Sequence, residues 1–330
     1  MNKATNNIVV IIPTLNEEKF IERCLLSVQN QTYFSDACEV LVVDGGSKDH
    51  TREIVQVISS SYPNIRLIDN PHRYQSAAFN IGVKESKGKY IIRMDAHAQY
   101  EQHYIERCIQ LLEEHEDYGN VGGQCKIIPQ NNHLVAQANA LLNHLRFGIG
   151  GADFRVGTKA KEVDSVPFGA FRREVIEHVG GMRADLARGE DNEYNSRIRQ
   201  AGYKVWFDPQ IQSYYYARAT ISSSMRQMYL NGKSIGNLVY VDPRAIGLRH
   251  LVPFCFVIAM IIGIVAAFFS VWGKWALLAL LTIYFIAAFI ADISACRAYG
   301  WKFFFILFLL FFLVHCSYGI GTIIGLLNIK

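Results

Sequence analysis

Two acidic clusters, about a hundred residues apart, contain the side chains best suited to chemistry in this chain. Asp95 and His97 follow the apolar run 90–94, and Glu190 and Asp191 precede a stretch of helical spacing. A carboxylate and an imidazole can bind a divalent ion whose other positions are filled by water and substrate phosphates. A separate carboxylate can take a proton from a reacting hydroxyl. Together the clusters predict transfer chemistry on a charged, phosphate-bearing donor.

Each cluster also has a simpler interpretation. Asp95 and His97 would then be solvated side chains of a surface loop, and the acids at 190–193 would only favour the dipole of a helix. Two observations favour the functional interpretation. Glu190, Asp191 and Glu193 crowd three carboxyl groups together, so one is expected to have a raised pKa suited to a general base. The apolar run before Asp95 predicts a buried strand, and open α/β sheets bind ligands at the carboxyl ends of such strands.

Further polar residues follow other predicted strands and are expected to line the same crevice. They are Thr14, Asn16 and Glu17 after the first strand, Asp44 after the second, and Arg73 in a later loop. A carboxylate at position 44, followed by two glycines, can accept hydrogen bonds from a ribose or a base while the ligand approaches closely. The alternatives are a turn aspartate at 44 and a solvated arginine at 73.

The elements that must position these residues alternate between strand and helix over the first hundred residues. Strands are predicted at 8–12, 39–43, 65–68 and 90–94, and helices at 20–28, 51–59 and 76–84. This alternation is typical of βαβ units and predicts an α/β fold with a mainly parallel central sheet. Later elements are predicted as strands at 121–128 and 205–207 and helices at 134–147 and 190–201, the last strand ending at Asp208-Pro209.

The last third of the chain is apolar and basic. Residues 218–330 contain nine Lys or Arg and two Asp, a net charge of +7, which leaves −3 of the total of +4 for residues 1–217. Apolar runs at about 251–272, 275–295 and 303–327 are long enough to cross a bilayer, although buried soluble helices are the alternative. Basic residues precede the first run and lie between the second and third, so these two segments and residues 1–217 are expected on the cytoplasmic side, with the C-terminus outside.

Four motifs occur in the order found in a known enzyme family. They are PTLNEE at 13–18, DGGSKDHT at 44–51, DAH at 95–97 and GEDNEYNSR at 189–197. Together they resemble family 2 of the inverting glycosyltransferases, which have the GT-A nucleotide-sugar fold, and within it the bacterial succinoglycan and exopolysaccharide type. The resemblance covers roughly residues 6–240. Each motif alone is weak, but four in order are specific.

The resemblance implies a role for each matched position. Thr14, Asn16, Glu17, Asp44, Arg73 and Asp95 would bind the nucleotide sugar. Asp95 and His97 would hold manganese or magnesium, although His97 stands where the family usually has a second Asp. Asp191 matches the catalytic base, and secondary or acceptor positions are expected at Glu190, Phe168, Gly169 and Lys233. The Gln-x-x-Arg-Trp motif of processive relatives is not matched at Gln227, which favours the addition of a single sugar.

The resulting expectation has three segments. Residues 1–217 form the GT-A glycosyltransferase domain, 218–250 a basic juxtamembrane segment, and 251–330 a membrane domain of three transmembrane helices. The enzyme would be a multi-pass protein of the inner (cytoplasmic) membrane with its catalytic domain in the cytoplasm. It would move a sugar, as a UDP-sugar, to a polyprenyl-diphosphate-linked saccharide, with no nucleic acid partner. The alternatives are a nucleotidyltransferase and a membrane protein with a degenerate, non-catalytic sugar-binding domain.

Overall fold

The computed structural model describes residues 7–32, 38–149 and 151–327, and it divides the chain into two compact units. The first unit comprises Met1–Lys126 and Gly157–Tyr215, and the second comprises Ile127–Val156 and Tyr216–Lys330. Residues 127–156 thus belong with the C-terminal helices, although in sequence they lie within the stretch expected to form the glycosyltransferase domain.

The first unit is built on a mixed sheet of nine described strands in the order β3-β2-β1-β4-β8-β6-β9-β5, with β7 beside β9. The strands are β1 (Ile8–Thr14), β2 (Cys38–Asp44), β3 (Ile65–Asp69), β4 (Tyr90–Arg93), β5 (Ala98–Tyr100), β6 (Tyr118–Ile128), β7 (Lys161–Glu162), β8 (Ala170–Arg172) and β9 (Lys204–Tyr216). Strands β3, β2, β1 and β4 run parallel, whereas β8 pairs antiparallel with β4 and with β6. The predicted α/β fold with its parallel core is confirmed.

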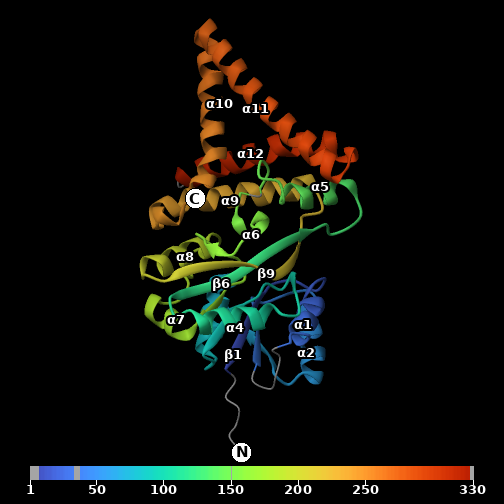
Figure 1. Ribbon diagram of the computed structural model, residues 1–330, viewed down its shortest axis with the longest axis vertical. Helices are drawn as coiled ribbons and strands as arrows, with labels where there is room; N and C mark the ends of the chain where they lie inside the picture. The colour runs from blue at the N-terminus through green and yellow to red at the C-terminus, as the bar shows by residue number, and fades with distance from the viewer. Residues whose placement is uncertain (1–6, 33–37, 150, 328–330) are drawn as a thin grey trace, which may run out of the picture. The chain divides into compact units, whose positions relative to one another are not determined.

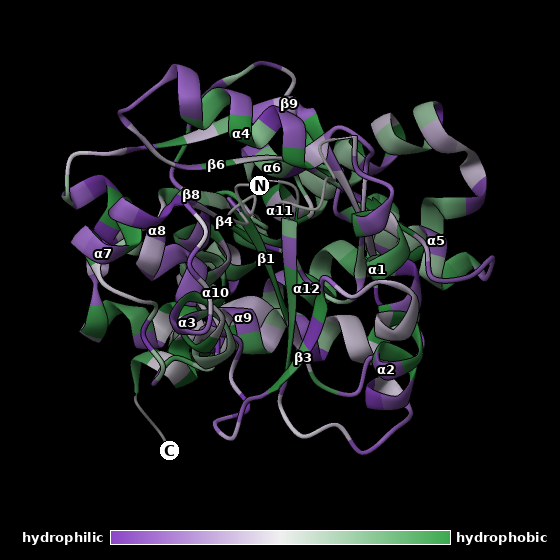
Figure 2. Cartoon of the chain, turned by 90° about the horizontal axis from the view of Figure 1, so that it is seen from below, coloured by the Kyte–Doolittle hydropathy of each residue, from purple (hydrophilic) through white to green (hydrophobic). Residues whose placement is uncertain are grey.

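Helices pack around this sheet. They are α1 (Ile21–Gln29), α2 (Thr51–Ser61), α3 (Gln75–Lys84), α4 (Tyr104–Glu114), α7 (Arg173–Val179) and α8 (Glu190–Gln200). All residues of β1 are buried, as expected for a β-branched strand covered on both faces, and Figure 2 shows β1 coloured hydrophobic at the centre of the sheet. Helix α3 lies close to β1 at Gly82, where an added Cβ would be 2.7 Å from Cδ1 of Ile11.

Two of the predicted elements have different bounds. The strand predicted at 205–207 continues through Asp208-Pro209 to Tyr216. Pro209 lies between the stretch of β9 that pairs with β7 and the stretch that pairs with β5, so its missing N–H interrupts neither pairing. The helix predicted at 134–147 ends at Leu142, because residues 143–149 form turns.

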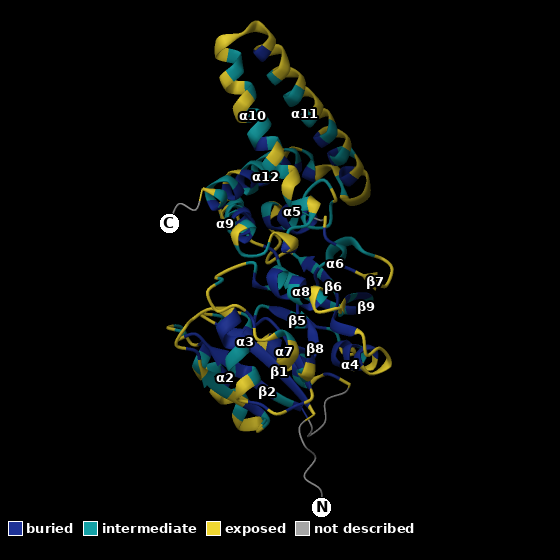
Figure 3. Cartoon of the chain, turned by 90° about the vertical axis from the view of Figure 1, so that its left-hand side faces the viewer, coloured by how far each residue is buried: buried dark blue, intermediate teal, exposed yellow. Residues whose placement is uncertain are grey.

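The second unit is helical. It contains α5 (Leu134–Leu142), α6 (Asp153–Val156), α9 (Ile221–Val241), α10 (Leu251–Phe269), α11 (Val271–Tyr299) and α12 (Phe304–Leu326). Among the described helices, α10, α11 and α12 are long and apolar enough to cross a membrane. Figure 1 shows α10 and α11 as a helical hairpin, with α12 beside α9 across the base of that hairpin. Figure 3 shows that α10 and α11 are exposed or intermediate along most of their length, as expected of helices that face lipid.

Candidate active site

The candidate active site is organised by a buried cation, Arg93, at the carboxyl end of β4. Its guanidinium donates hydrogen bonds to Asp191, to Oε1 of Gln75 at 3.0 Å and to Oδ1 of Asp95 at 3.2 Å. Oε1 of Glu190 lies 3.6 Å from the same guanidinium. The side chain of Arg93 is only 4% exposed. The two acidic clusters of the sequence are therefore joined through one arginine.

The arginine and the carboxyl groups perturb one another. Burial lowers the pKa of Arg93, but the carboxylates of Asp191, Asp95 and Glu190 outweigh it, so the pKa lies above its ordinary value. Burial, reinforced by the charge of Asp191, raises the pKa of Glu190 to about 7. Burial also raises the pKa of Asp191, while Arg93 opposes the rise. The expected raised carboxyl pKa is thus found at both positions.

Exposure distinguishes these two carboxyl groups as candidates for the base. The side chain of Asp191 is 37% exposed, whereas that of Glu190 is 8% exposed. A general base must reach the proton it removes, which favours Asp191. The third acid of the cluster, Glu193, makes a two-bond ion pair with Arg197 at 2.6 and 2.9 Å within α8. Glu193 is therefore engaged within its own helix, which makes it a weaker candidate for the base.

Asp95 and His97 lie in the turn between β4 and β5 and have different partners. The Asp95 N–H donates to the Tyr100 hydroxyl at 2.6 Å, which fixes the backbone of the turn. Nδ1 of His97 lies 2.8 Å from Oε1 of Glu17, and its ring packs edge-on against Tyr215. Within 7–32, 38–149 and 151–327, no three His, Cys, Asp or Glu side chains converge as a metal site. The carboxylate of Asp95 suits a manganese or magnesium ion that takes most of its ligands from a donor diphosphate.

The loop after β2 is organised by Asp44, whose side chain is fully buried. Its carboxylate accepts from the Gly46 N–H at 3.1 Å, from the Ser47 N–H at 3.0 Å and from the Ser47 hydroxyl at 2.5 Å, and it pairs with Arg52 at 2.8 Å. Burial would raise the pKa of Asp44, but the bonds from Ser47 and Arg52 outweigh it and lower the pKa. Asp44 thus lies at the carboxyl end of β2, and its carboxylate is hydrogen-bonded within its own loop.

The loop after β1 is tied to the loop after β2. The Asn16 N–H donates to the Ser47 hydroxyl at 2.8 Å, and Oδ1 of Asn16 accepts from the Lys48 N–H at 2.8 Å. The Thr14 hydroxyl donates to the Ile12 carbonyl at 3.1 Å, so it is used within its own strand. Hydrogen bonds therefore join these two loops to each other at the carboxyl ends of β1 and β2.

Three expected site residues have strained backbones. Asn16, Arg73 and Phe168 have φ values of 56°, 66° and 51°, and they are the non-glycine residues of the described chain with positive φ. Such conformations concentrate at ligand-binding positions because the surrounding structure must impose them. A Cβ added to Gly45 would lie 3.3 Å from the Cα of Arg73, so the third loop lies against the second.

A buried amide network supports the segment that contains Phe168 and Gly169. Nδ2 of Asn120 donates to Oδ1 of Asn195 at 2.6 Å, and Nδ2 of Asn195 donates to Oγ of Ser165 at 3.0 Å. A Cβ added to Gly169 would lie 2.0 Å from Oδ1 of Asn120, so only glycine fits. A small cavity of about 10 Å³ is lined by residues of this network together with Arg93 and Asp191.

The sequence argument missed Arg93, Gln75 and the two asparagines of this network. Arg93 did leave a signal, because a charged residue inside an otherwise apolar strand is buried only when it is paired. The amides left none, since nothing in the sequence indicates that Asn120 and Asn195 meet. Lys233, predicted as a secondary site residue, belongs to α9 of the second unit.

Comparisons with known proteins agree with this geometry. The model of "Glycosyl transferase family 2" matches residues 9–180. The dolichyl N-acetyl-alpha-D-glucosaminyl phosphate 3-beta-D-2,3-diacetamido-2,3-dideoxy-beta-D-glucuronosyltransferase of Methanococcus voltae is 27% identical over 330 residues, which cover 98% of each chain. The succinoglycan biosynthesis protein ExoA of Rhizobium meliloti is 29% identical over 250 residues, 74% of each chain.

The fold is also that of a solved structure. The mannosyltransferase PcManGT from Pyrobaculum calidifontis, solved in complex with GDP-Man and Mn²⁺, matches with a TM-score of 0.62 at 18% identity, covering 98% of this chain and 88% of that chain. This likeness supports the GT-A fold that the four motifs implied. The motifs, the fold and the family match agree, and the chain belongs to glycosyl transferase family 2.

Proposed function

We propose that this glycosyltransferase moves a sugar from a nucleoside-diphosphate sugar to a lipid-linked saccharide, with inversion at the anomeric carbon. The observation that carries the proposal is the Arg93 cluster. One buried guanidinium contacts both Asp95, the candidate donor-diphosphate residue, and Asp191, the candidate base. These contacts support the proposal, because the residues proposed to act on the donor and on the acceptor share one guanidinium.

In the proposed reaction, Asp191 accepts the proton of the acceptor hydroxyl as its oxygen attacks the anomeric carbon. The bond to the donor diphosphate breaks on the opposite face, and the nucleoside diphosphate leaves with the electron pair. Arg93 acts as a positioning residue, because it holds the Asp191 carboxylate and favours its ionised form. Asp95 would hold a divalent ion, which supplies charge neutralisation to the leaving diphosphate. Arg73 would contact the same diphosphate.

The lipid-linked acceptor is proposed from two sources. The Methanococcus voltae relative, which matches over nearly its full length, is named for a dolichyl-phosphate-linked sugar acceptor. The chain also has long apolar helices suited to a membrane, where such acceptors reside. UDP-sugars are also proposed as donors. The catalytic unit is proposed to lie on the cytoplasmic side, because basic residues precede the first apolar run and lie between the second and third, and such residues collect on that side of a membrane.

The test is sugar transfer by the full-length protein in membranes. A panel of UDP- and GDP-sugars is offered with a lipid extract, and the product is identified by mass spectrometry with its anomeric configuration. Asp191→Asn should lower the rate about 10²–10⁴-fold, as expected for loss of a general base. Glu193→Gln is the matched control, and it should retain activity because Glu193 pairs with Arg197.

Two outcomes would contradict the proposal. If no nucleotide sugar supports transfer, or if the product retains the donor configuration, the proposed reaction is wrong. Near wild-type turnover by Asp191→Asn would reject this base and point to Glu190. Excess chelator tests the metal separately, and full activity there would remove Asp95 from that role.

A further inference from the structure

Hydropathy predicts three membrane crossings, but the backbone of α12 touches the backbone of α9. A Cβ added to Gly232 of α9 would lie 2.0 Å from the carbonyl oxygen of Tyr318 in α12. A Cβ added to Gly321 of α12 would lie 2.1 Å from the carbonyl oxygen of Tyr229 in α9. Glycines on both helices therefore allow direct backbone contact, which holds the two helices together as a pair.

The contact continues toward the C-terminal ends of both helices. A Cβ on Gly325 would lie 2.2 Å from the carbonyl oxygen of Lys233, and one on Gly236 would lie 2.4 Å from that of Thr322. The Tyr240 hydroxyl also donates to the carbonyl of residue 326. Helices α9 and α12 thus run side by side in the same direction, as Figure 1 shows.

Helix α9 cannot enter the hydrocarbon core. It carries Arg226, Lys233 and two asparagines, Asn231 and Asn237, and Arg226 is exposed. A charged side chain at the bilayer centre is strongly unfavourable, by about 2.5–3.5 kcal/mol or more. A helix fastened along α9 cannot cross the bilayer unless α9 crosses with it.

We propose that the chain crosses the membrane twice, through the α10–α11 hairpin, and that α9 and α12 lie together along the cytoplasmic surface of the bilayer. Residues on one side of α12 pack into the protein core of this unit, among them Leu307, Leu310 and Phe311. On the other side, Phe305 is 87% exposed and Leu309 is 46% exposed. Helix α12 is apolar all round because one face meets protein and the other meets lipid.

The ends of the hairpin carry the residues expected at two membrane interfaces. Trp272 and Trp275 are exposed at its tip, beside Lys274, and Tyr299 and Trp301 are exposed at its base. Tryptophan and tyrosine collect at the two boundaries of the hydrocarbon layer. Helix α10 has 19 residues, and at about 1.5 Å per residue it spans about 28 Å, close to the thickness of that layer.

Helix α11 is longer than the layer requires, and its extra turns lie within protein. Asp292 is fully buried there, and Ala295 and Cys296 join the core that includes Leu307 of α12. The acidic residue that interrupts the second apolar run is therefore buried within the protein and is not exposed to lipid.

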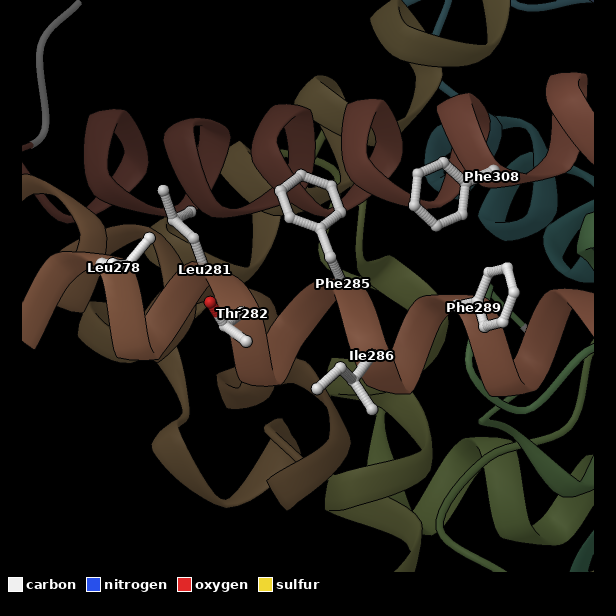
Figure 4. A pocket seen from close by; sticks show the side chains of 7 residues that line it. All are labelled: Leu278, Leu281, Thr282, Phe285, Ile286, Phe289 and Phe308. Atoms are coloured by element: carbon white, nitrogen blue, oxygen red, sulfur yellow. The ribbon is translucent and has the colours of Figure 1, made fainter.

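A groove of about 550 Å³ opens where α11 meets α12. It is lined by Leu281, Phe285, Ile286 and Phe289 of α11 and by Phe308 of α12, with Thr282 as its polar member, and Figure 4 shows these side chains along the two helices. In the proposed arrangement this groove faces the hydrocarbon layer, and lipid chains fill it.

The test measures which side of the membrane each end of the hairpin and of α12 faces. Single cysteines are placed at Lys274, Lys302 and Lys330 in the full chain with Cys255→Ser, since Cys255 is the exposed native thiol of the described residues. Cells of a Gram-negative host are treated with a membrane-impermeant maleimide before and after permeabilisation. The readout does not depend on transferase activity, so its outcome is separate from that of the proposed function.

Two crossings predict that Lys274→Cys is labelled in intact cells, whereas Lys302→Cys and Lys330→Cys are labelled only after permeabilisation. Labelling of both Lys274→Cys and Lys330→Cys in intact cells would show three crossings and overturn the proposal. Protection of Lys274→Cys in intact cells would show that the hairpin does not cross, which also overturns it.

Discussion

Replacing Arg93 by methionine removes the cation shared by Asp95, Glu190 and Asp191. Breaking a buried ion pair from one side typically costs about 3–5 kcal/mol, because the remaining charge loses its partner. The side chains of Asp95 and Glu190 are 12% and 8% exposed, but that of Asp191 is 37% exposed and is screened by water. We therefore expect a loss of about 3 kcal/mol in the free energy of unfolding at pH 8, near the lower end of the range.

The loss should depend on pH. The pKa of Glu190 is already raised to about 7, and without Arg93 the pKa values of both Glu190 and Asp191 rise further. A carboxyl group whose folded pKa exceeds its unfolded pKa opposes folding once it ionises, so its penalty grows as the pH rises. Thermal melting in detergent should show a larger difference between variant and wild type at pH 8.5 than at pH 6.

The same substitution should change catalysis. With Arg93 absent, Asp191 binds its proton more tightly, so the acid limb of the pH profile of kcat/KM should move to higher pH. The maximum rate should fall about 10²-fold, the effect of a base displaced by about 1 Å. Arg93→Lys keeps the charge but not the forked geometry, so we expect a lower rate with the acid limb near its wild-type position.

Arg107→Met provides the matched control. Arg107 pairs with Asp208 at 2.9 Å, an ion pair whose acid is buried but which lies outside the Arg93 cluster. It should lower stability without moving the acid limb. If Arg93→Met keeps the wild-type acid limb and is destabilised equally at both pH values, Arg93 does not set the charge state of these carboxyl groups.

Three other substitutions test the surroundings of the site. Asp44→Asn should weaken nucleotide binding in calorimetry. Because the pKa of Asp44 is lowered in the folded state, the variant should also lose less stability than wild type as the pH falls below about 4. Gly169→Ala forces a Cβ to within 2.0 Å of Asn120, so it should lower the free energy of unfolding by about 1–3 kcal/mol and reduce activity. At Gly202 nothing lies within 4 Å, so Gly202→Ala should show only backbone strain of about 1–2 kcal/mol. Tyr100→Phe leaves the buried Asp95 N–H without its partner and should lower the melting temperature by an amount that corresponds to about 1–3 kcal/mol. Equal stability of Gly169→Ala and Gly202→Ala, or an unchanged melting temperature for Tyr100→Phe, would contradict the corresponding contact.

The parallel strands and the polar residues at their ends could be predicted from sequence, because apolar runs of four to seven residues specify buried strands locally. The pairing of those polar residues could not. His97 is predicted to bind a metal with Asp95, and this stays a prediction; its Nδ1 contact with Glu17, from the loop after β1, could not be foreseen. Such partners depend on loop conformation, which the pattern of apolar residues does not encode.

Helix α12 shows a different limit. Its composition is that of a membrane span, and hydropathy measures composition alone. The glycines at 319, 321 and 325 indicate close packing but not the identity of the partner helix. That partner, α9, became evident only from the backbone contacts.

The left-handed backbone at Arg73 carries a further consequence. Glycine would adopt this φ without strain, whereas a residue with a Cβ costs about 1–2 kcal/mol there. Asn16 and Phe168, with the same kind of backbone, use their side chains within the protein: Asn16 accepts a hydrogen bond from Lys48, and Phe168 packs edge-on against Tyr100. Arg73 is exposed, and no hydrogen bond or ion pair of its guanidinium is found among the described residues. This backbone strain at an exposed arginine is what the proposed contact between Arg73 and the donor diphosphate would explain. Substitution of Arg73 by glycine should then raise the free energy of unfolding and weaken binding of the nucleotide sugar.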